Sequence, residues 1–184
     1  MLSQFTSQDG KQTLMDYFKV PKDVYAVGRL DYDSEGLLIL TNDKRLNNQL
    51  LNPLHAHQRT YWVQVDGAIT QQAIITLQQG VNISVDGKIY CTAKCSATIL
   101  EAAPLVPERN PPIRVRKNIP TTWIALTITE GKNRQVRKMT AAVGFPTLRL
   151  IRYSIGSCTI VGLKPGDMKL LTANDVQQIF LKNG

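Results

Sequence analysis

Three carboxylates at alternate positions crowd one short stretch of the chain: Asp31, Asp33 and Glu35. Gly28 and Gly36 bracket this stretch and permit backbone angles closed to other residues, so we expect a loop. Arg29 precedes Asp31 by two positions, and a nearby guanidinium favours the ionised form of a carboxyl group. An ionised, positioned carboxylate can act as a nucleophile, a general base or a metal ligand.

The same composition also suits an ordinary surface turn, because Asp and Ser side chains hydrogen-bond their own backbone in turns. Apolar runs at residues 24–27 and 37–40 flank the loop. The second run is apolar at every position, which predicts a strand buried on both faces, although so short a run does not by itself exclude a helix. Local composition therefore leaves a catalytic loop and a plain turn both open.

A spaced pattern adds a resemblance. The stretch Gly28–Leu38 resembles the signature G-R-L-D-x-x-[ST]-x-G-L-[LI] of pseudouridine synthases, and among them the ribosomal branch called the RsuA family. The resemblance implies that Asp31 is the catalytic carboxylate. It also implies isomerisation of a uridine in bacterial large-subunit ribosomal RNA to pseudouridine, a reaction that needs no metal or redox cofactor.

Two further blocks are similar to motifs of the same family. Arg59–Val63 matches a basic residue followed by Tyr-x-Val, which implies that Tyr61 packs on the target base. An aromatic residue on an apolar strand face is equally what a protein core requires. Gly131–Arg137 resembles G-[RK]-x-[RH]-Q-[VI]-R, which implies that Arg137 pairs with Asp31. The same segment also reads as an ordinary amphipathic helix with a solvated basic side.

The positive charge is concentrated. The net charge is +8, and residues 107–152 contain ten basic side chains against two acidic ones. Concentrated positive charge is the footprint of a polyanionic partner, so we expect ribosomal RNA to bind there. The predicted phosphate contacts are Arg29, Arg109, Arg114, Arg116, Lys117, Lys132, Arg134 and Arg149.

Local signals place the elements that would position these residues. Asn42-Asp43 predicts a helix that ends before Asn52-Pro53, and Thr70 predicts another that ends at Gly80. Asp86-Gly87 predicts a hairpin over 81–89. We also expect a helical turn around Leu14, a proline-rich loop over 107–120, a helix capped by Asn133, and strands over 59–66, 93–100, 121–129 and 145–152. A strand pair and a helix around Val176–Phe180 are expected to follow.

The fold that the resemblance implies is α+β, a mixed and mostly antiparallel sheet with flanking helices and a central cleft. Residues 1–184 are expected to form one catalytic domain without the S4-like RNA-binding domain of many family members. Members also carry a Lys-Pro strand immediately ahead of the segment that matches Leu2. Either another segment or a partner chain covers the edge that this strand would pair with, or the natural protein starts upstream of Met1, and we favour the upstream start.

Several classes of protein are disfavoured. No apolar run reaches the roughly 18–20 residues that cross a bilayer, and the first residues lack a secretory core, so we expect a cytoplasmic protein and, further, a monomer. Cys91, Cys95 and Cys158 are expected to be reduced thiols rather than a zinc site. Two alternatives stay open: a non-catalytic RNA-binding or ribosome-assembly module, and a hydrolase that uses Asp31 and Glu35. The sequence also leaves open whether Asp31 acts as nucleophile or base.

Overall fold

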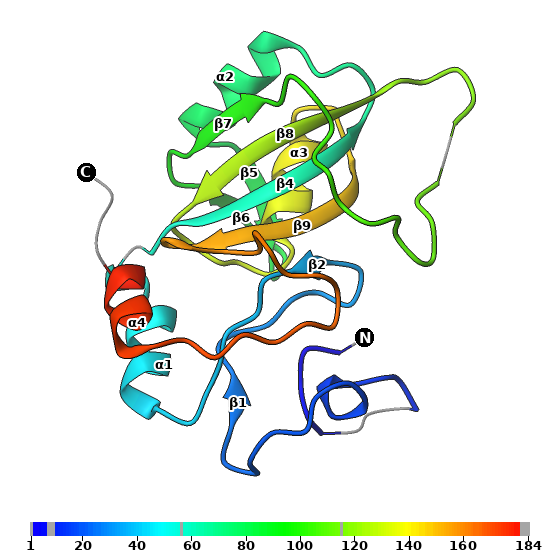
Figure 1. Cartoon of the computed structure of the whole chain (residues 1–184). Coiled ribbons are helices and arrows are strands. Elements are labelled where there is room, and N and C mark those ends of the chain that lie inside the picture. Colours follow the sequence, from blue (N-terminus) through cyan, green and yellow to red (C-terminus); the bar gives the residue numbers. More distant parts are fainter. Residues whose placement is uncertain (1, 7–9, 56, 115, 181–184) are drawn as a thin grey trace.

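A mixed sheet forms the centre of the molecule. The computed structural model describes residues 2–6, 10–55, 57–114 and 116–180. Five strands follow one another across the sheet, each antiparallel to its neighbours: β10 (Cys158–Thr159), β9 (Thr147–Ile155), β4 (Arg59–Asp66), β8 (Thr121–Ile128) and β7 (Ser96–Ile99). A sixth strand, β2 (Glu35–Gly36), pairs with β9 in parallel (Figure 1). The predicted α+β class with a mostly antiparallel mixed sheet is confirmed.

The main core lies where β4 is flanked by β8 and β9. Val63 sits opposite Ile124 on β8 and Leu150 on β9, and none of the three is appreciably exposed. Apolar side chains of α2 (Gln71–Gln79) and α3 (Gln135–Ala142) belong to the same cluster. Both helices therefore pack against the sheet through this core.

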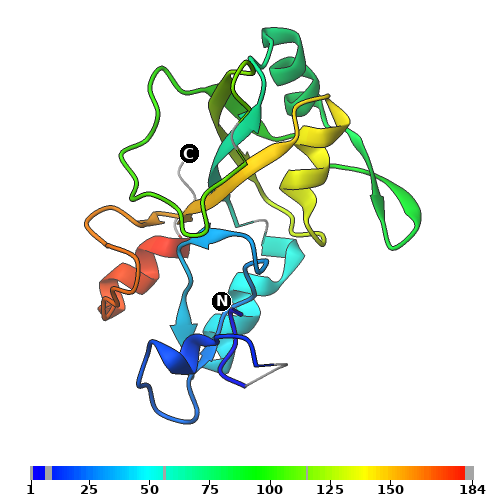
Figure 2. The same cartoon turned by 90° about the vertical axis from the view of Figure 1, so that its right-hand side faces the viewer.

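A second, smaller core lies beside the other end of the sheet. It brings together Val27, Leu37, Ile39, Leu50, Ile155 and Ile179. These residues come from or adjoin the small sheet of β1 (Tyr25–Ala26) and β3 (Leu40–Thr41), the helices α1 (Lys44–Leu51) and α4 (Ala173–Phe180), and the end of β9. Figures 1 and 2 show this group below the main sheet, with β2 between the two.

Short-range signals placed the caps and the hairpin correctly. Asp43 accepts hydrogen bonds from the amides of Arg45 and Leu46, and Thr70 accepts one from the amide of Ala73. The strands β5 (Asn82–Val85) and β6 (Lys88–Cys91) are joined by Asp86 and Gly87, both with positive φ, as a type I′ turn requires.

Other predictions were wrong in detail. The run 37–40 is not one strand buried on both faces, because Leu38 and Leu40 are only half-buried. The Leu37 amide bonds to Arg152 of β9, whereas the Ile39 carbonyl accepts from Val27 near β1, so the run divides between two sheets. The cap of α3 is Arg134, with φ 53°, rather than Asn133.

The two chain ends show further differences. Among the described residues after 156, β10 alone is a strand and pairs back onto β9, so the predicted strand pair is a single strand. Near the start, Leu2 bridges to Thr13 and a short 3-10 helix η1 (Leu14–Asp16) follows, as predicted around Leu14. A second 3-10 turn, η2 (Pro53–His55), follows α1. In the described ranges, no helix has the length and apolar character to cross a membrane.

Candidate active site

The loop that carries Asp31 is fixed at its far end by β2. Glu35 and Gly36 pair in register with Ile151 and Arg152 of β9. Gly36 has φ 107°, and a Cβ atom there would collide with the backbone carbonyl and amide of Arg152. Glycine is therefore required for the loop to lie this close to the sheet.

The backbone just before Asp31 is held by Ser3. The Ser3 hydroxyl donates to the Leu30 carbonyl at 3.0 Å and accepts from the Leu30 amide at 2.9 Å. The Ser3 side chain thus satisfies both backbone polar groups of Leu30, the residue before Asp31. Sequence reasoning missed Ser3, because nothing near Leu2 indicates a partner 27 positions later.

Asp33, rather than Asp31, is the centre of the ion pairs in the loop. Arg134 donates two hydrogen bonds to its carboxylate, at 2.8 and 2.9 Å. These bonds, together with the charge of Arg137, hold the pKa of Asp33 below its usual value, although partial burial opposes the shift. Arg134 reaches Asp31 only at 3.9 Å, so Asp31 is the less engaged of the two carboxylates.

Arg137 contacts the same loop from α3. Its Nη2 donates to the Asp33 carbonyl at 2.8 Å and lies 3.5 Å from the Asp33 carboxylate. Only 12% of its side chain is exposed, and this burial lowers its pKa. Among the described residues, the guanidinium that forms an ion pair with Asp31 is that of Arg134, whereas Arg137 bonds to Asp33 in place of the predicted direct pair.

Glu35, the third carboxylate of the loop, pairs with Arg149 and Arg109. Arg149 donates to its two oxygens at 3.0 and 2.8 Å, and Arg109 lies 3.1 Å away. Arg149 was predicted to contact phosphate, and in the structure its side chain is 10% exposed and paired with Glu35. Two arginines within the mostly buried strand β9 were the available signal, because buried charges need partners.

Tyr61 is connected to the loop through Arg152. The two residues are opposite each other on β4 and β9, and the Tyr61 ring packs on the main core. Arg152 Nε donates to the Leu37 carbonyl at 2.7 Å. Burial lowers the pKa of Arg152, and the neighbouring Tyr61 side chain opposes that shift. Arg152 was not assigned a role from the sequence.

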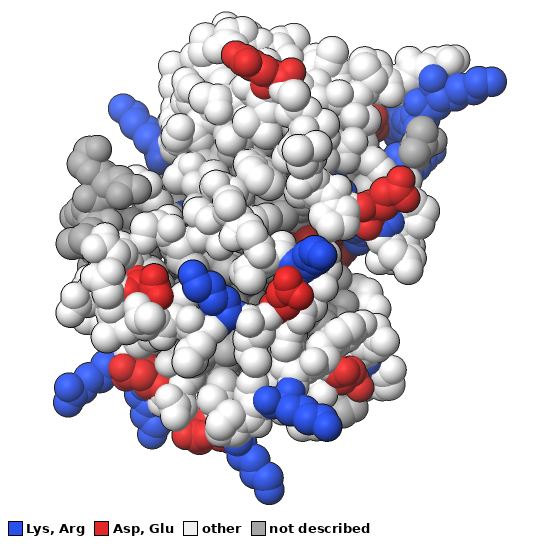
Figure 3. All heavy atoms as spheres, viewed as in Figure 1, with Lys and Arg blue, Asp and Glu red and all other residues white. Residues whose placement is uncertain are grey.

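The other predicted RNA contacts lie on the surface or near it. Arg29, Arg114, Lys117 and Lys132 are exposed. Arg116 pairs with Asp66 at 3.3 Å, and Lys132 lies over the Tyr90 ring, 4.9 Å from its centre. In Figure 3 basic side chains gather at the upper right, where Figure 1 places the loop over residues 100–120. This loop contains no helix or strand in its described residues.

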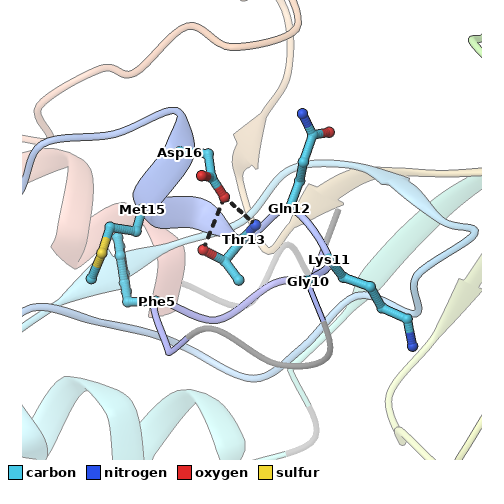
Figure 4. Close-up of a pocket in the computed structure, with 7 residues that line it drawn as sticks. All are labelled: Phe5, Gly10, Lys11, Gln12, Thr13, Met15 and Asp16. Carbon is cyan, nitrogen blue, oxygen red and sulfur yellow. Dashed lines mark hydrogen bonds between the residues drawn. The ribbon is translucent and has the colours of Figure 1, made fainter.

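A small pocket lies elsewhere. It is lined by Phe5, Gly10, Lys11, Gln12, Thr13, Met15 and Asp16 (Figure 4). None of the three loop carboxylates lines it, so this pocket is not the predicted central cleft. In the part of the chain that the structure describes, no group of three or more His, Cys, Asp and Glu side chains could hold a metal ion.

The fold and these motifs define a class of enzyme. The family model described as RNA pseudouridylate synthase matches residues 4–142, so the chain belongs to that family and the predicted enzyme class is confirmed. A protein of Vibrio parahaemolyticus named "Ribosomal large subunit pseudouridine synthase E" is 55% identical over 91% of this chain and 68% of its own length. A Xanthomonas campestris protein of the same name is 46% identical over 96% of this chain and 93% of its own.

A solved structure has a similar fold. The "Crystal structure of pseudouridylate synthase" is similar with a TM-score of 0.75 and 25% identity. The match covers 93% of this chain and 66% of the solved one. The architecture of the sheet and helices is therefore that of the family.

Proposed function

We propose that this protein isomerises a uridine of large-subunit ribosomal RNA to pseudouridine. The observation that carries the proposal is the loop at Asp31, held between Ser3, α3 and β9, with its signature residues in the order that the family motif requires. The names of the similar proteins support a large-subunit substrate. Residues 1–184 would act as one catalytic domain.

In this reaction the N–C glycosidic bond breaks, the uracil turns, and a C–C bond forms to the same sugar. A proton leaves the new bonding carbon and the freed nitrogen gains one, so substrate and product are isomers and no further reactant is consumed. Asp31 supplies a carboxylate that attacks the reacting nucleoside or removes a proton. It suits this role because Asp33 takes the strong Arg134 hydrogen bonds and leaves Asp31 accessible.

The neighbouring side chains would hold the substrate. Because a uridine inside a helix is out of reach, the base must leave its stack, and the Tyr61 ring would pack against it. Exposed cations would contact phosphates around it: Arg29, Arg114, Lys117 and Lys132. Arg109, Arg116 and Arg134 would contribute positive potential while paired with carboxylates of the protein.

The test is to map pseudouridine in ribosomal RNA from cells with and without the gene, then restore either wild type or Asp31→Asn. We expect one large-subunit pseudouridine to be lost and then restored by wild type alone. Asp86→Asn is the matched control, because the same change falls on an exposed hairpin residue with φ 49°, where Asn is tolerated. Identical maps with and without the gene would refute the function. Purified protein given naked RNA or large-subunit particles identifies the substrate form.

A further inference from the structure

Glu35 joins three segments that are far apart in the sequence. Its carboxylate belongs to the Asp31 loop, Arg149 comes from β9, and Arg109 comes from the segment over residues 100–120. Arg109 Nη2 also lies 3.5 Å from the Asp33 carbonyl. One carboxylate is therefore the point at which the basic segment is attached to the catalytic loop.

The attachment is reinforced through the backbone. Arg149 Nη2, while bound to Glu35, also donates to the Pro107 carbonyl at 2.8 Å. Arg109 Nη1 donates to the Pro111 carbonyl at 3.1 Å. Two prolines of the segment thus present carbonyls to the guanidiniums that Glu35 holds. Without Glu35, both cations would repel each other and lose the charge that balances them.

The segment has a second attachment at its other end. Arg116 pairs with Asp66 of β4 at 3.3 Å, and the Gly67 amide donates to the Pro120 carbonyl at 2.8 Å. This end is attached to the sheet, without a contact to the Asp31 loop in the described structure. The exposed Arg114 lies between the two attachments. An irregular segment of this length loses much conformational entropy when it is fixed, so its few ion pairs decide where Arg114 is held.

We propose that Glu35 is a positioning residue that couples the RNA-contacting segment 100–120 to the Asp31 loop. Through this coupling, RNA bound to the segment is held in a defined position relative to the Asp31 carboxylate. The coupling rests on the proposed function. It also removes Glu35 from the hydrolase alternative, since a carboxylate paired with two guanidiniums is not a free acid or base. Its role is exerted through Arg109 and Arg149, without contact to the reacting atoms.

The experiment compares Glu35→Gln with Asp66→Asn, which removes the same kind of ion pair from the other end of the segment. Single-turnover rates are measured over a range of enzyme concentrations with a large-subunit RNA fragment. For Glu35→Gln we expect the saturated rate to fall at least tenfold and the half-saturating concentration to rise. For Asp66→Asn we expect a higher half-saturating concentration at an unchanged saturated rate. Glu35→Asp, which keeps the charge, should recover part of the saturated rate.

A second readout does not depend on catalysis. Limited trypsin digestion, followed by mass spectrometry, measures cleavage after Arg114 and Lys117. Both variants should be cut several-fold faster than wild type if each pair holds the segment. If Glu35→Gln keeps wild-type kinetics and wild-type cleavage, the coupling is refuted. The coupling is also wrong if Glu35→Gln and Asp66→Asn change the saturated rate equally. If wild type makes no product while Glu35→Gln is cut faster, the proposed function fails and the attachment stands.

Discussion

Tyr61 on β4 and Arg152 on β9 are direct cross-strand partners, and Arg152 Nε also donates to the Leu37 carbonyl at the end of the Asp31 loop. Arg152 is 4% exposed, and its Nη2 has no hydrogen-bond partner in the described structure. Burying a guanidinium is costly unless its N–H groups are used. The cost is offset here by the hydrogen bond to the Leu37 carbonyl, with the Tyr61 side chain as the cross-strand neighbour. Arg152 thus links Tyr61, which is proposed to face the base, to the loop that carries Asp31.

Arg152→Lys should therefore impair the reaction more than binding. A lysine has a point charge and cannot serve both Tyr61 and the Leu37 carbonyl as a planar guanidinium does. We expect a loss of at least tenfold in single-turnover rate at saturating enzyme, with RNA affinity within threefold of wild type. Arg116→Lys, at an exposed arginine that pairs with Asp66, is the control and should keep the saturated rate. Equal rates for wild type and Arg152→Lys would contradict the link.

Arg137 and Arg134 should differ in their contribution to folding. Arg137→Gln removes the 2.8 Å donor of the Asp33 carbonyl at a mostly buried site and leaves it the longer 3.5 Å contact to Arg109. Loss of a good donor to a buried group costs up to about 1–3 kcal/mol. Arg134 and Asp33 are both more than a third exposed, and such pairs contribute about 0–1 kcal/mol. Urea unfolding at equal slope compares the two variants. A larger loss for Arg134→Gln would show that the assignment is reversed.

The same variant of Arg134 should change the titration of Asp33. Because its hydrogen bonds lower the pKa of Asp33 in the native state, that pair stabilises the fold above the ordinary value near 3.8 and loses its contribution as the pH falls through the lowered native value. In Arg134→Gln the Asp33 pKa should rise towards its ordinary value. Carboxyl carbon shifts followed by NMR between pH 2 and 6 measure it. An unchanged or lower pKa would contradict the role given to Arg134.

Gly36→Ala should separate β2 from β9. The added Cβ meets the Arg152 backbone, and φ is already 107°, so both a collision and a strained conformation result. We expect a loss of several kcal/mol in unfolding free energy, combining backbone strain of about 1–3 kcal/mol with the lost pairing. Gly166→Ala is the control, since φ is 89° there but nothing lies within 4 Å of the new Cβ. Equal losses from both would show that close packing at Gly36 is unimportant.

The cysteines should differ in reactivity. Burial raises the pKa of Cys95 to about 11, and its thiol donates to the Leu77 carbonyl. At pH 8 only about one molecule in a thousand would carry the thiolate at Cys95, and the thiolate is the reactive form. Cys91 is exposed. Iodoacetamide at pH 8 followed by peptide mass analysis should show Cys91 labelled well before Cys95, and the opposite order would contradict the buried placement.

Local features of the fold were predictable because their causes are local. The caps at Asp43 and Thr70 and the turn at Asp86 each depend on neighbours within a few positions. The family motifs located Asp31, Tyr61 and Arg137, whose roles stay predictions. The cap of α3 was misplaced by one residue: Asn133 is the better capping type, but Arg134, whose side chain bonds to Asp33, occupies the cap position.

The acidic partners of the basic side chains could not be predicted from the sequence. A count of basic residues treats Arg149 and Arg114 alike, but Arg149 is neutralised by Glu35, 114 positions away, and Arg114 is exposed. Charge patterning finds the segment that faces a polyanion. It does not separate cations that bind the ligand from cations that hold the protein together, because that depends on which acids the sheet brings near.

The parallel pairing of β2 with β9 also sets an order of events during synthesis. Leu37 is made early, yet Arg152, which holds it, leaves the ribosome 115 residues later. Closing so long a loop is entropically unfavourable and slow. Strand β4 is likewise synthesised before β8 and β9, the two strands that pair with it. A nascent chain thus carries Asp31 without the helix and strand that orient it until residues 135–155 have been made. On the proposed function, the carboxylate is placed for the reaction only after β9 has joined β2.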